Sequence, residues 1–113
     1  MAVVLTENLC NRLDLMKKTI RTPADLGLVL RGVRKSQALR QDDLAAISGV
    51  GPVFAGEVER GKESVHLGKV LKLLEEAGIR LILEYADSAE DSVQAQFSKG
   101  VKPVKPRSQK AVQ

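Results

Sequence analysis

The sequence predicts a mainly α-helical bundle with one short β-strand near its C-terminal end. Apolar residues recur at helical spacing in several segments before residue 79, and proline and glycine stand where such segments begin and end. The run RLILEYA at residues 80–86 is too short for a helix and is rich in residues that favour strands. A chain of 113 residues is long enough for one small domain with a single core.

The first expected helix covers about residues 6–18 and belongs to an N-terminal extension, residues 1–22. Thr6 is a candidate cap for this helix. The apolar side chains that fall near one of its faces are Leu5, Leu9, Leu13 and Met16. An apolar face of this kind requires a covering surface, because its exposure to water is unfavourable.

Two helices are expected next, at the start of a domain that spans residues 23–79. The first covers about residues 23–37, since the preceding Thr22 is a favourable cap and proline suits the first helical position. The second covers residues 41–48 and ends at Gly49, a residue that adopts a positive φ without strain. Acidic residues in its first turn are stabilised by the positive end of the helix dipole.

Two further helices complete this domain. One covers about residues 52–60, again with proline at its start, and Gly61 follows it. The other covers residues 67–77 and ends at Gly78. The apolar residues that recur at helical spacing in the latter are Leu67, Val70, Leu71, Leu74 and Ala77.

The expected strand at residues 80–86 has no partner strand within the domain. An unpaired strand exposes a row of backbone N–H and C=O groups, which a second copy of the same strand would satisfy. We therefore predict a homodimer in which two such strands pair across a two-fold axis. The paired residues would be Leu81, Ile82, Leu83, Glu84 and Tyr85. The alternative is pairing with residues 2–5, AVVL, of the same chain.

The net charge of +4 is concentrated at the C-terminal end. Residues 1–91 contain thirteen basic and fourteen acidic side chains, whereas residues 92–113 contain five basic side chains and no acidic one. Because the latter also contain prolines and no apolar face of regular period, residues 87–113 are expected to form a disordered basic tail. Its candidate roles are a DNA tether and a segment that folds on a protein partner. The alternative is a solvated chain end without a function.

Several classes of protein are disfavoured by composition. No apolar run approaches the roughly 18 residues that span a bilayer, and charge appears too early for a signal peptide, so a cytoplasmic protein without membrane contact is expected. Cys10 and His66 are the only cysteine and histidine, too few for a zinc site, and no cofactor is expected. No nucleophile and base stand at a suitable spacing, so we do not expect an enzyme.

The residue types between Gln41 and Val58 fit a helix-turn-helix. Such a unit needs a small residue where its helices cross, a glycine at the corner and apolar residues on the buried sides. Ala45 and Gly49 meet the first two needs, and the apolar positions are Leu44, Val50, Ala55 and Val58. A generic helical hairpin would reproduce part of this pattern. Glu59 is best interpreted as an internal polar contact.

This segment also resembles a known family. The run LRGVRKSQALRQDDLAAISGV at residues 30–50, followed by EVERGK at residues 57–62, is similar to the Xre or lambda-repressor-like helix-turn-helix. The positions that match are Gln41, Leu44, Ala45, Gly49, Val50, Glu59, Gly61 and Lys62. Residues 49–83 more narrowly resemble the HipB-type antitoxins, whose helical core is followed by a strand that pairs between protomers.

The resemblance implies a function. Proteins of this type bind a double-stranded DNA operator as dimers, repress their own transcription and hold a HipA-type serine/threonine kinase toxin inactive. Two alternatives remain open. One is a protein-binding antitoxin with little sequence-specific DNA recognition, and the other is a phage-repressor-type regulator without a toxin.

The helix-turn-helix geometry also suggests which residues meet DNA. The first helix crosses the sugar-phosphate backbone and the second enters the major groove by its N-terminal residues. Expected phosphate contacts are Arg34, Arg40, Gln41, Arg60 and Lys62. The resemblance to HipB-like and related repressors implies that the positions facing the bases are Val53, Phe54, Gly56 and Glu57.

The base-facing positions contain no arginine, glutamine or asparagine, the usual bidentate readers of bases. Two interpretations remain open. Val53 and Phe54 contact thymine methyl groups while DNA shape supplies further specificity, or specific binding is weakened and the apolar helix meets another partner. Phe54 is alternatively a core residue, because large aromatic side chains are more often buried.

Overall fold

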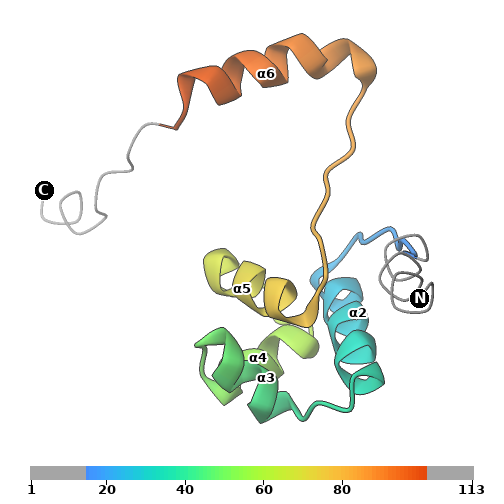
Figure 1. Cartoon of the computed structure of the whole chain (residues 1–113), viewed down its shortest axis with the longest axis vertical. Helices are drawn as coiled ribbons and strands as arrows, with labels where there is room; N and C mark the ends of the chain where they lie inside the picture. Colours follow the sequence, from blue (N-terminus) through green and yellow to red (C-terminus); the bar gives the residue numbers. More distant parts are fainter. Residues whose placement is uncertain (1–14, 102–113) are drawn as a thin grey trace, which may run out of the picture. The chain divides into compact units, whose positions relative to one another are not determined.

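The structure is a computed structural model that describes residues 15–101 (Figure 1). The chain divides after Leu81 into two compact units. The first contains four helices: α2 (Pro23–Ser36), α3 (Gln41–Ser48), α4 (Pro52–Glu59) and α5 (Leu67–Ala77). All four expected helices of this domain are confirmed, with ends that differ from the expected ones by no more than a residue.

Local signals explain where these helices begin and end. The Thr22 side chain accepts a hydrogen bond from the backbone N–H of Asp25, at 3.1 Å, and so caps α2. Gly49 and Gly78 follow α3 and α5 with φ of 75° and 81°, a conformation that other residues adopt only with strain. These caps fix the lengths of the helices, and therefore the faces that they turn inwards.

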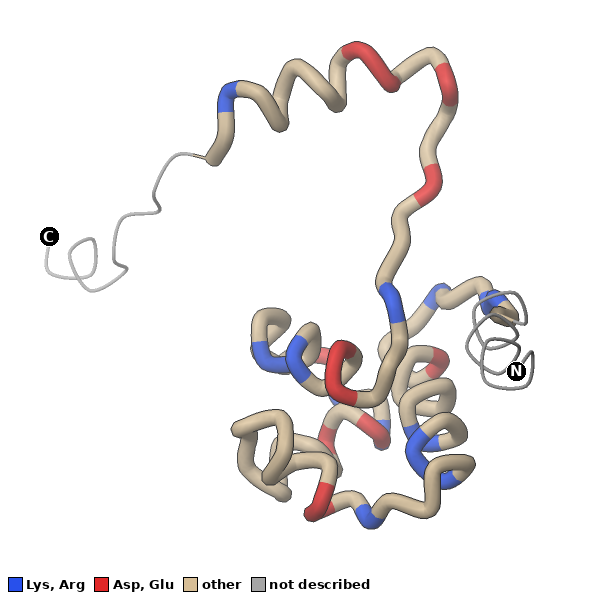
Figure 2. The backbone as a smooth tube through the Cα atoms, in the orientation of Figure 1, with Lys and Arg blue, Asp and Glu red and all other residues tan. Residues whose placement is uncertain are grey.

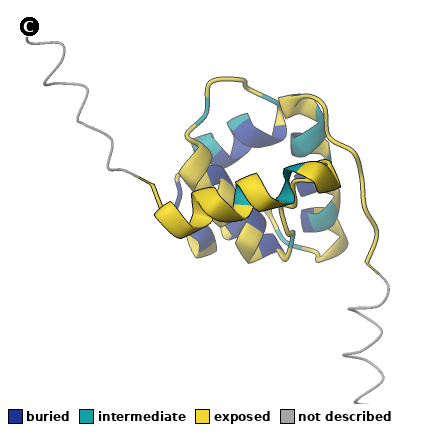
Figure 3. Ribbon diagram, turned by 90° about the horizontal axis from the view of Figure 1, so that it is seen from above, coloured by how far each residue is buried: buried dark blue, intermediate teal, exposed yellow. Residues whose placement is uncertain are grey.

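The core of the first unit lies between α2, α3, α4 and α5. Its largest fully buried side chains are Leu30, Leu44 and Leu73, contributed by three different helices. Smaller buried residues complete it, namely Ala45, Val50, Ala55, Val58, Val70, Leu74 and Ala77. Figure 3 shows these inward faces as buried segments and the outer faces as exposed. A single core therefore holds α3 and α4 in place.

Helices α2 and α4 approach each other so closely that their crossing requires glycine. A Cβ atom on Gly27 would lie 2.5 Å from the carbonyl oxygen of Val58 and 2.6 Å from that of Glu59. Just beyond α4, Gly61 has a φ of 82°, and a Cβ there would lie 2.7 Å from the Cα of Ala24. Backbone contact at both points fixes α4 against α2.

The helix expected at residues 6–18 is not seen at residues 15–18, the part of this range that the structure describes. Residues 15–21 have no regular secondary structure, and residues 1–14 lie outside the described residues. Met16 is 91% exposed, so this end of the predicted apolar face contacts little among residues 15–101. Helical spacing alone does not stabilise a helix, because most helix stability comes from packing an apolar face.

The expected β-strand is likewise not seen. Residues 80–86 carry no regular secondary structure, and no strand occurs within residues 15–101. A strand exists through hydrogen bonds to a neighbouring strand, and residues 15–101 offer none. Four of the five residues expected to pair have large apolar side chains that are exposed: Leu81, Ile82, Leu83 and Tyr85. The alternative partner, residues 2–5, lies outside the described residues.

The second unit contains a 3₁₀ helix at Asp87–Ala89 and helix α6, Glu90–Lys99. The prediction of a disordered tail is therefore wrong for residues 87–99, whereas residues 102–113 lie outside the described residues. Acidic residues in the first turn and a lysine in the last complement the helix dipole, and the Tyr85 hydroxyl donates to Glu90 Oε1 at 2.7 Å.

Within residues 15–101, no helix combines the length and the apolar character that a bilayer span requires. The same residues contain no group of three or more side chains suited to hold a metal ion.

Candidate nucleic-acid interface

Helices α3 and α4 form a helix-turn-helix. Ala45 on α3 and Ala55 on α4 are 0% and 1% exposed, so small residues occupy the inner sides of both helices. The corner is Gly49, and the next N–H, that of Val50, donates to the carbonyl of Ala45 at 3.0 Å. This arrangement matches the unit that the sequence predicts.

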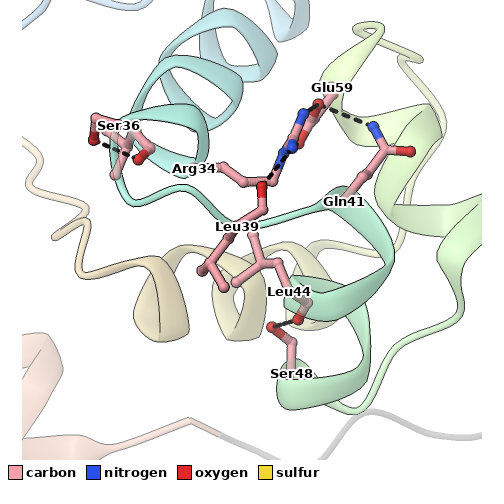
Figure 4. A network of polar contacts seen from close by, with 8 residues as sticks. Arg34, Ser36, Leu39, Gln41, Leu44, Ser48 and Glu59 are labelled. Carbon is pink, nitrogen blue, oxygen red and sulfur yellow. Dashed lines mark hydrogen bonds and ion pairs between the residues drawn. The ribbon is translucent and has the colours of Figure 1, made fainter.

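A buried ion pair supports this unit from within (Figure 4). Arg34 of α2 donates from Nε to Glu59 Oε2 at 2.6 Å and from Nη2 to Glu59 Oε1 at 3.0 Å. Its Nη1 donates to the carbonyl of Leu39 at 2.8 Å. The two charged side chains are only 10% and 4% exposed. One guanidinium thus joins α2, the connection before α3, and the end of α4.

The pair also shifts the ionisation of its members. Burial by itself raises the pKa of Glu59, but hydrogen bonds from Arg34 and Gln41, together with the positive charge of Arg34, outweigh burial and hold that pKa below its ordinary value. The hydrogen bond to Glu59 raises the pKa of Arg34. Both groups therefore stay charged inside the protein, and the expectation that Glu59 makes an internal polar contact is confirmed.

This geometry corrects the role expected for Arg34. All three of its donor nitrogens are engaged inside the protein, and the residue is 8% exposed. It is not available to a DNA phosphate. Its position four residues after the fully buried Leu30 places it on the inner face of α2, a signal that the sequence contains.

Gln41, at the first position of α3, is held by the same network. Its side-chain Nε2 donates to Glu59 Oε1 at 2.9 Å, as Figure 4 shows. An amide carries two N–H donors, so one of them remains for an outside acceptor. The carbonyl Oε1 of Gln41 lies over α4, 3.1 Å from the ideal Cβ position of Gly56.

The other expected phosphate contacts lie at the surface. Arg40 pairs with Asp42 at 3.0 Å and Lys62 pairs with Glu57 at 3.2 Å, and all four side chains are partly or largely exposed. Exposed ion pairs contribute little stability, so these cations can exchange their partners for phosphate oxygens at small cost. Arg60 is exposed and belongs to no ion pair within residues 15–101.

The four positions expected to face bases differ in exposure. Val53 is 71% exposed, at the beginning of α4. Phe54 is half-buried and packs against the core, so the structure favours the alternative of a core residue for most of its ring. Gly56 is buried beneath the Gln41 and Arg60 side chains, which corrects its expected open position. Glu57 is half-buried and engaged by a lysine.

One cation near α4 was not among the expected contacts. Lys69 of α5 places its Nζ 5.7 Å from the ring centroid of Phe54, within the range of a cation–π interaction. It lies outside the helix-turn-helix, on the next helix of the chain, and the packing of α5 brings it there. By contrast, residues 44–56 contain no charged side chain, so this stretch is tan throughout in Figure 2.

The fold and the surface of α3 and α4 define a helix-turn-helix protein. No family model matches the sequence. The chain is 51% identical over 63 residues to the uncharacterized HTH-type transcriptional regulator y4mF of Sinorhizobium fredii. The matched residues make up 56% of this chain and 83% of that protein. The chain therefore belongs to the HTH-type transcriptional regulators.

Solved structures show the same fold at lower sequence identity. HipB in a HipB-O4 20mer complex is 21% identical with a TM-score of 0.57, over 63% of this chain and all of that one. HipB in a HipA-HipB-O2-O3 complex is 20% identical with the same TM-score, over the same shares of the two chains.

Proposed function

We propose that this protein is a sequence-specific transcriptional repressor that binds a double-stranded DNA operator through α3 and α4. One observation carries the proposal: Gln41, held in place by a buried ion pair, lies beside Arg60 over α4, and Arg40 and Lys62 are exposed nearby. These groups serve as phosphate contacts, which position the protein on DNA without reading sequence.

Reading of bases falls mainly to the beginning of α4. Val53 is exposed there, next to the exposed Pro52, and an apolar group recognises the methyl group of thymine. Phe54 contributes only the edge that its packing leaves free. Because α4 offers no bidentate hydrogen-bonding reader, DNA shape supplies the rest of the specificity.

The repressor acts as a homodimer in this proposal. Residues 81–85 of two copies pair as strands, which would satisfy backbone groups and cover exposed apolar side chains such as Leu83, 78% exposed. Sedimentation of the full chain and of a variant that lacks residues 80–113 tests this step. A dimer that survives the deletion unchanged contradicts strand pairing.

The antitoxin role extends the proposal to a HipA-type serine/threonine kinase. Its support is the fold shared with HipB, which is found with HipA in a solved complex. The competing function is a protein-binding antitoxin with little sequence-specific DNA recognition, and the lack of any charged side chain in residues 44–56 favours it. A phage-repressor-type regulator without a toxin is distinguished by failure to bind or inhibit such a kinase.

The deciding experiment measures binding to the DNA upstream of the protein's own gene and to a scrambled duplex, each at two salt concentrations. The proposal expects affinity that falls as salt rises and a clear preference for the natural sequence. Equal affinity for both duplexes refutes a specific repressor and leaves the protein-binding function.

A further inference from the structure

Gly56 lies within α4, a helix of eight residues, where glycine is an unfavourable choice. Its φ is not positive, so backbone conformation does not require it. Two other helical glycines provide a comparison. At Gly27 a Cβ would meet backbone carbonyl groups, and at Gly32 it would meet nothing within 4 Å. Gly56 belongs to neither type.

The space above Gly56 is occupied by the ends of two polar side chains. Its ideal Cβ position lies 3.1 Å from Arg60 Nη1, 3.1 Å from Gln41 Oε1 and 3.7 Å from Arg60 Cζ. No backbone atom is among these neighbours. The missing side chain therefore allows a guanidinium from the end of α4 and the carbonyl oxygen of the Gln41 amide, from the start of α3, to lie over the same spot.

The charges around this spot leave it open to an anion. The carboxylate of Glu59 accepts a hydrogen bond from Gln41 and is neutralised by Arg34. Asp42 is paired with Arg40. Gln41 also begins α3, where free backbone N–H groups and the helix dipole favour negative charge.

We propose that Gly56 is a positioning residue, whose lack of a side chain brings Gln41 and Arg60 together so that both bind one DNA phosphate. The planar guanidinium of Arg60 suits two phosphate oxygens, and the second N–H of Gln41 donates to the same group. This inference rests on the proposed binding of DNA. It adds that α4 contributes a phosphate contact from its C-terminal end, over the glycine.

The test compares Gly56→Leu with Gly32→Leu, a matched change at an exposed helical glycine that meets nothing. Binding to the natural upstream duplex is measured across salt concentrations, and thermal melting checks the fold. Gly56→Leu is expected to reduce the slope of log affinity against log salt by about 0.9 for each phosphate lost, as Arg60→Ala does. Gly32→Leu is expected to leave the slope unchanged.

A milder variant keeps the test decisive if leucine disturbs folding. Gly56→Ala moves the Arg60 and Gln41 side-chain ends by only a few tenths of an ångström. It should melt at a higher temperature, since alanine favours helices, and yet bind DNA more weakly. Higher stability with unchanged DNA affinity contradicts the inference.

A double-variant comparison separates positioning from a direct clash with DNA. If Gly56 acts only through its two neighbours, Gly56→Leu causes no further loss in a Gln41→Ala, Arg60→Ala background. An equal loss in that background shows that leucine obstructs the duplex itself, which overturns the proposed role. Failure of the wild-type protein to prefer its own upstream DNA refutes the repressor function instead, while the salt slope on a scrambled duplex still tests Gly56.

Discussion

Replacing Gly27 by alanine tests the close crossing of α2 and α4. Alanine is about 1 kcal/mol more favourable than glycine inside a helix, so the change would stabilise the protein if the site had room. The new Cβ would instead lie 2.5 Å and 2.6 Å from the carbonyl oxygens of Val58 and Glu59. Both neighbours are backbone atoms, which cannot turn aside as a side chain can.

The helices must therefore move apart or the new residue must remain strained. Overpacking costs about 1–3 kcal/mol, and a contact with rigid backbone belongs near the upper end of that range. After the gain in helix propensity is subtracted, the free energy of unfolding is expected to fall by about 2 kcal/mol. For a domain of this size that corresponds to a fall in melting temperature of roughly 10 °C.

The assay is urea and thermal unfolding followed by circular dichroism, with Gly32→Ala as control. Gly32 lies on the same helix and its Cβ would meet nothing within 4 Å, so this variant should gain up to about 1 kcal/mol. The two substitutions are therefore expected to have opposite signs. Equal stabilisation by both would refute the backbone contact between α2 and α4.

Three further predictions concern the same unit. Arg34→Ala leaves the carboxylate of Glu59 buried without its partner and should cost about 3–5 kcal/mol in urea unfolding; a loss below about 1 kcal/mol would contradict a buried pair. The pKa of Glu59 is lower in the folded protein than in the unfolded chain, so its contribution to stability is present above about pH 4.3 and is lost as pH falls through the folded value. Urea midpoints measured from neutral pH into the acid range should show this loss, and the Glu59→Gln variant should lack that component; identical pH profiles would refute it. Phe54→Ala should lower the melting temperature because the ring packs against the core, and a variant with unchanged melting but lost operator affinity would show a contact with DNA instead.

The sequence was sufficient to predict the four helices of the first unit. Their limits depend on residues adjacent in the chain, such as the Thr22 cap and the left-handed Gly49, so local chemistry determines them. The helix-turn-helix followed from the same kind of signal, together with small residues where the helices cross. These features do not require knowledge of distant contacts.

The polar network could be predicted only in part. That Glu59 makes an internal contact was apparent, but its partner Arg34 is 25 residues away and was expected at the DNA surface. The convergence of Gln41 and Arg60 over Gly56 depends on how α3 packs against α4, which no single segment encodes. Lys69 reaches Phe54 for the same reason.

The elements outside the bundle show the limit of local patterns. The predicted helix before residue 19 and the strand at residues 80–86 each need a partner surface, and spacing does not reveal whether a single chain provides it. Helix α6 has favourable charges at both ends, but the prolines and basic residues that follow it in the sequence indicate a disordered tail.

The position of Arg34 links the packing of α4 to the orientation of the Gln41 side chain. Its guanidinium holds both the carbonyl of Leu39 and the carboxylate of Glu59, and that carboxylate in turn orients Gln41. A protomer in which α4 has not reached its native place consequently lacks an ordered Gln41 as well. A defect in this buried network would therefore also disturb Gln41, the side chain that the proposed function assigns to a DNA phosphate.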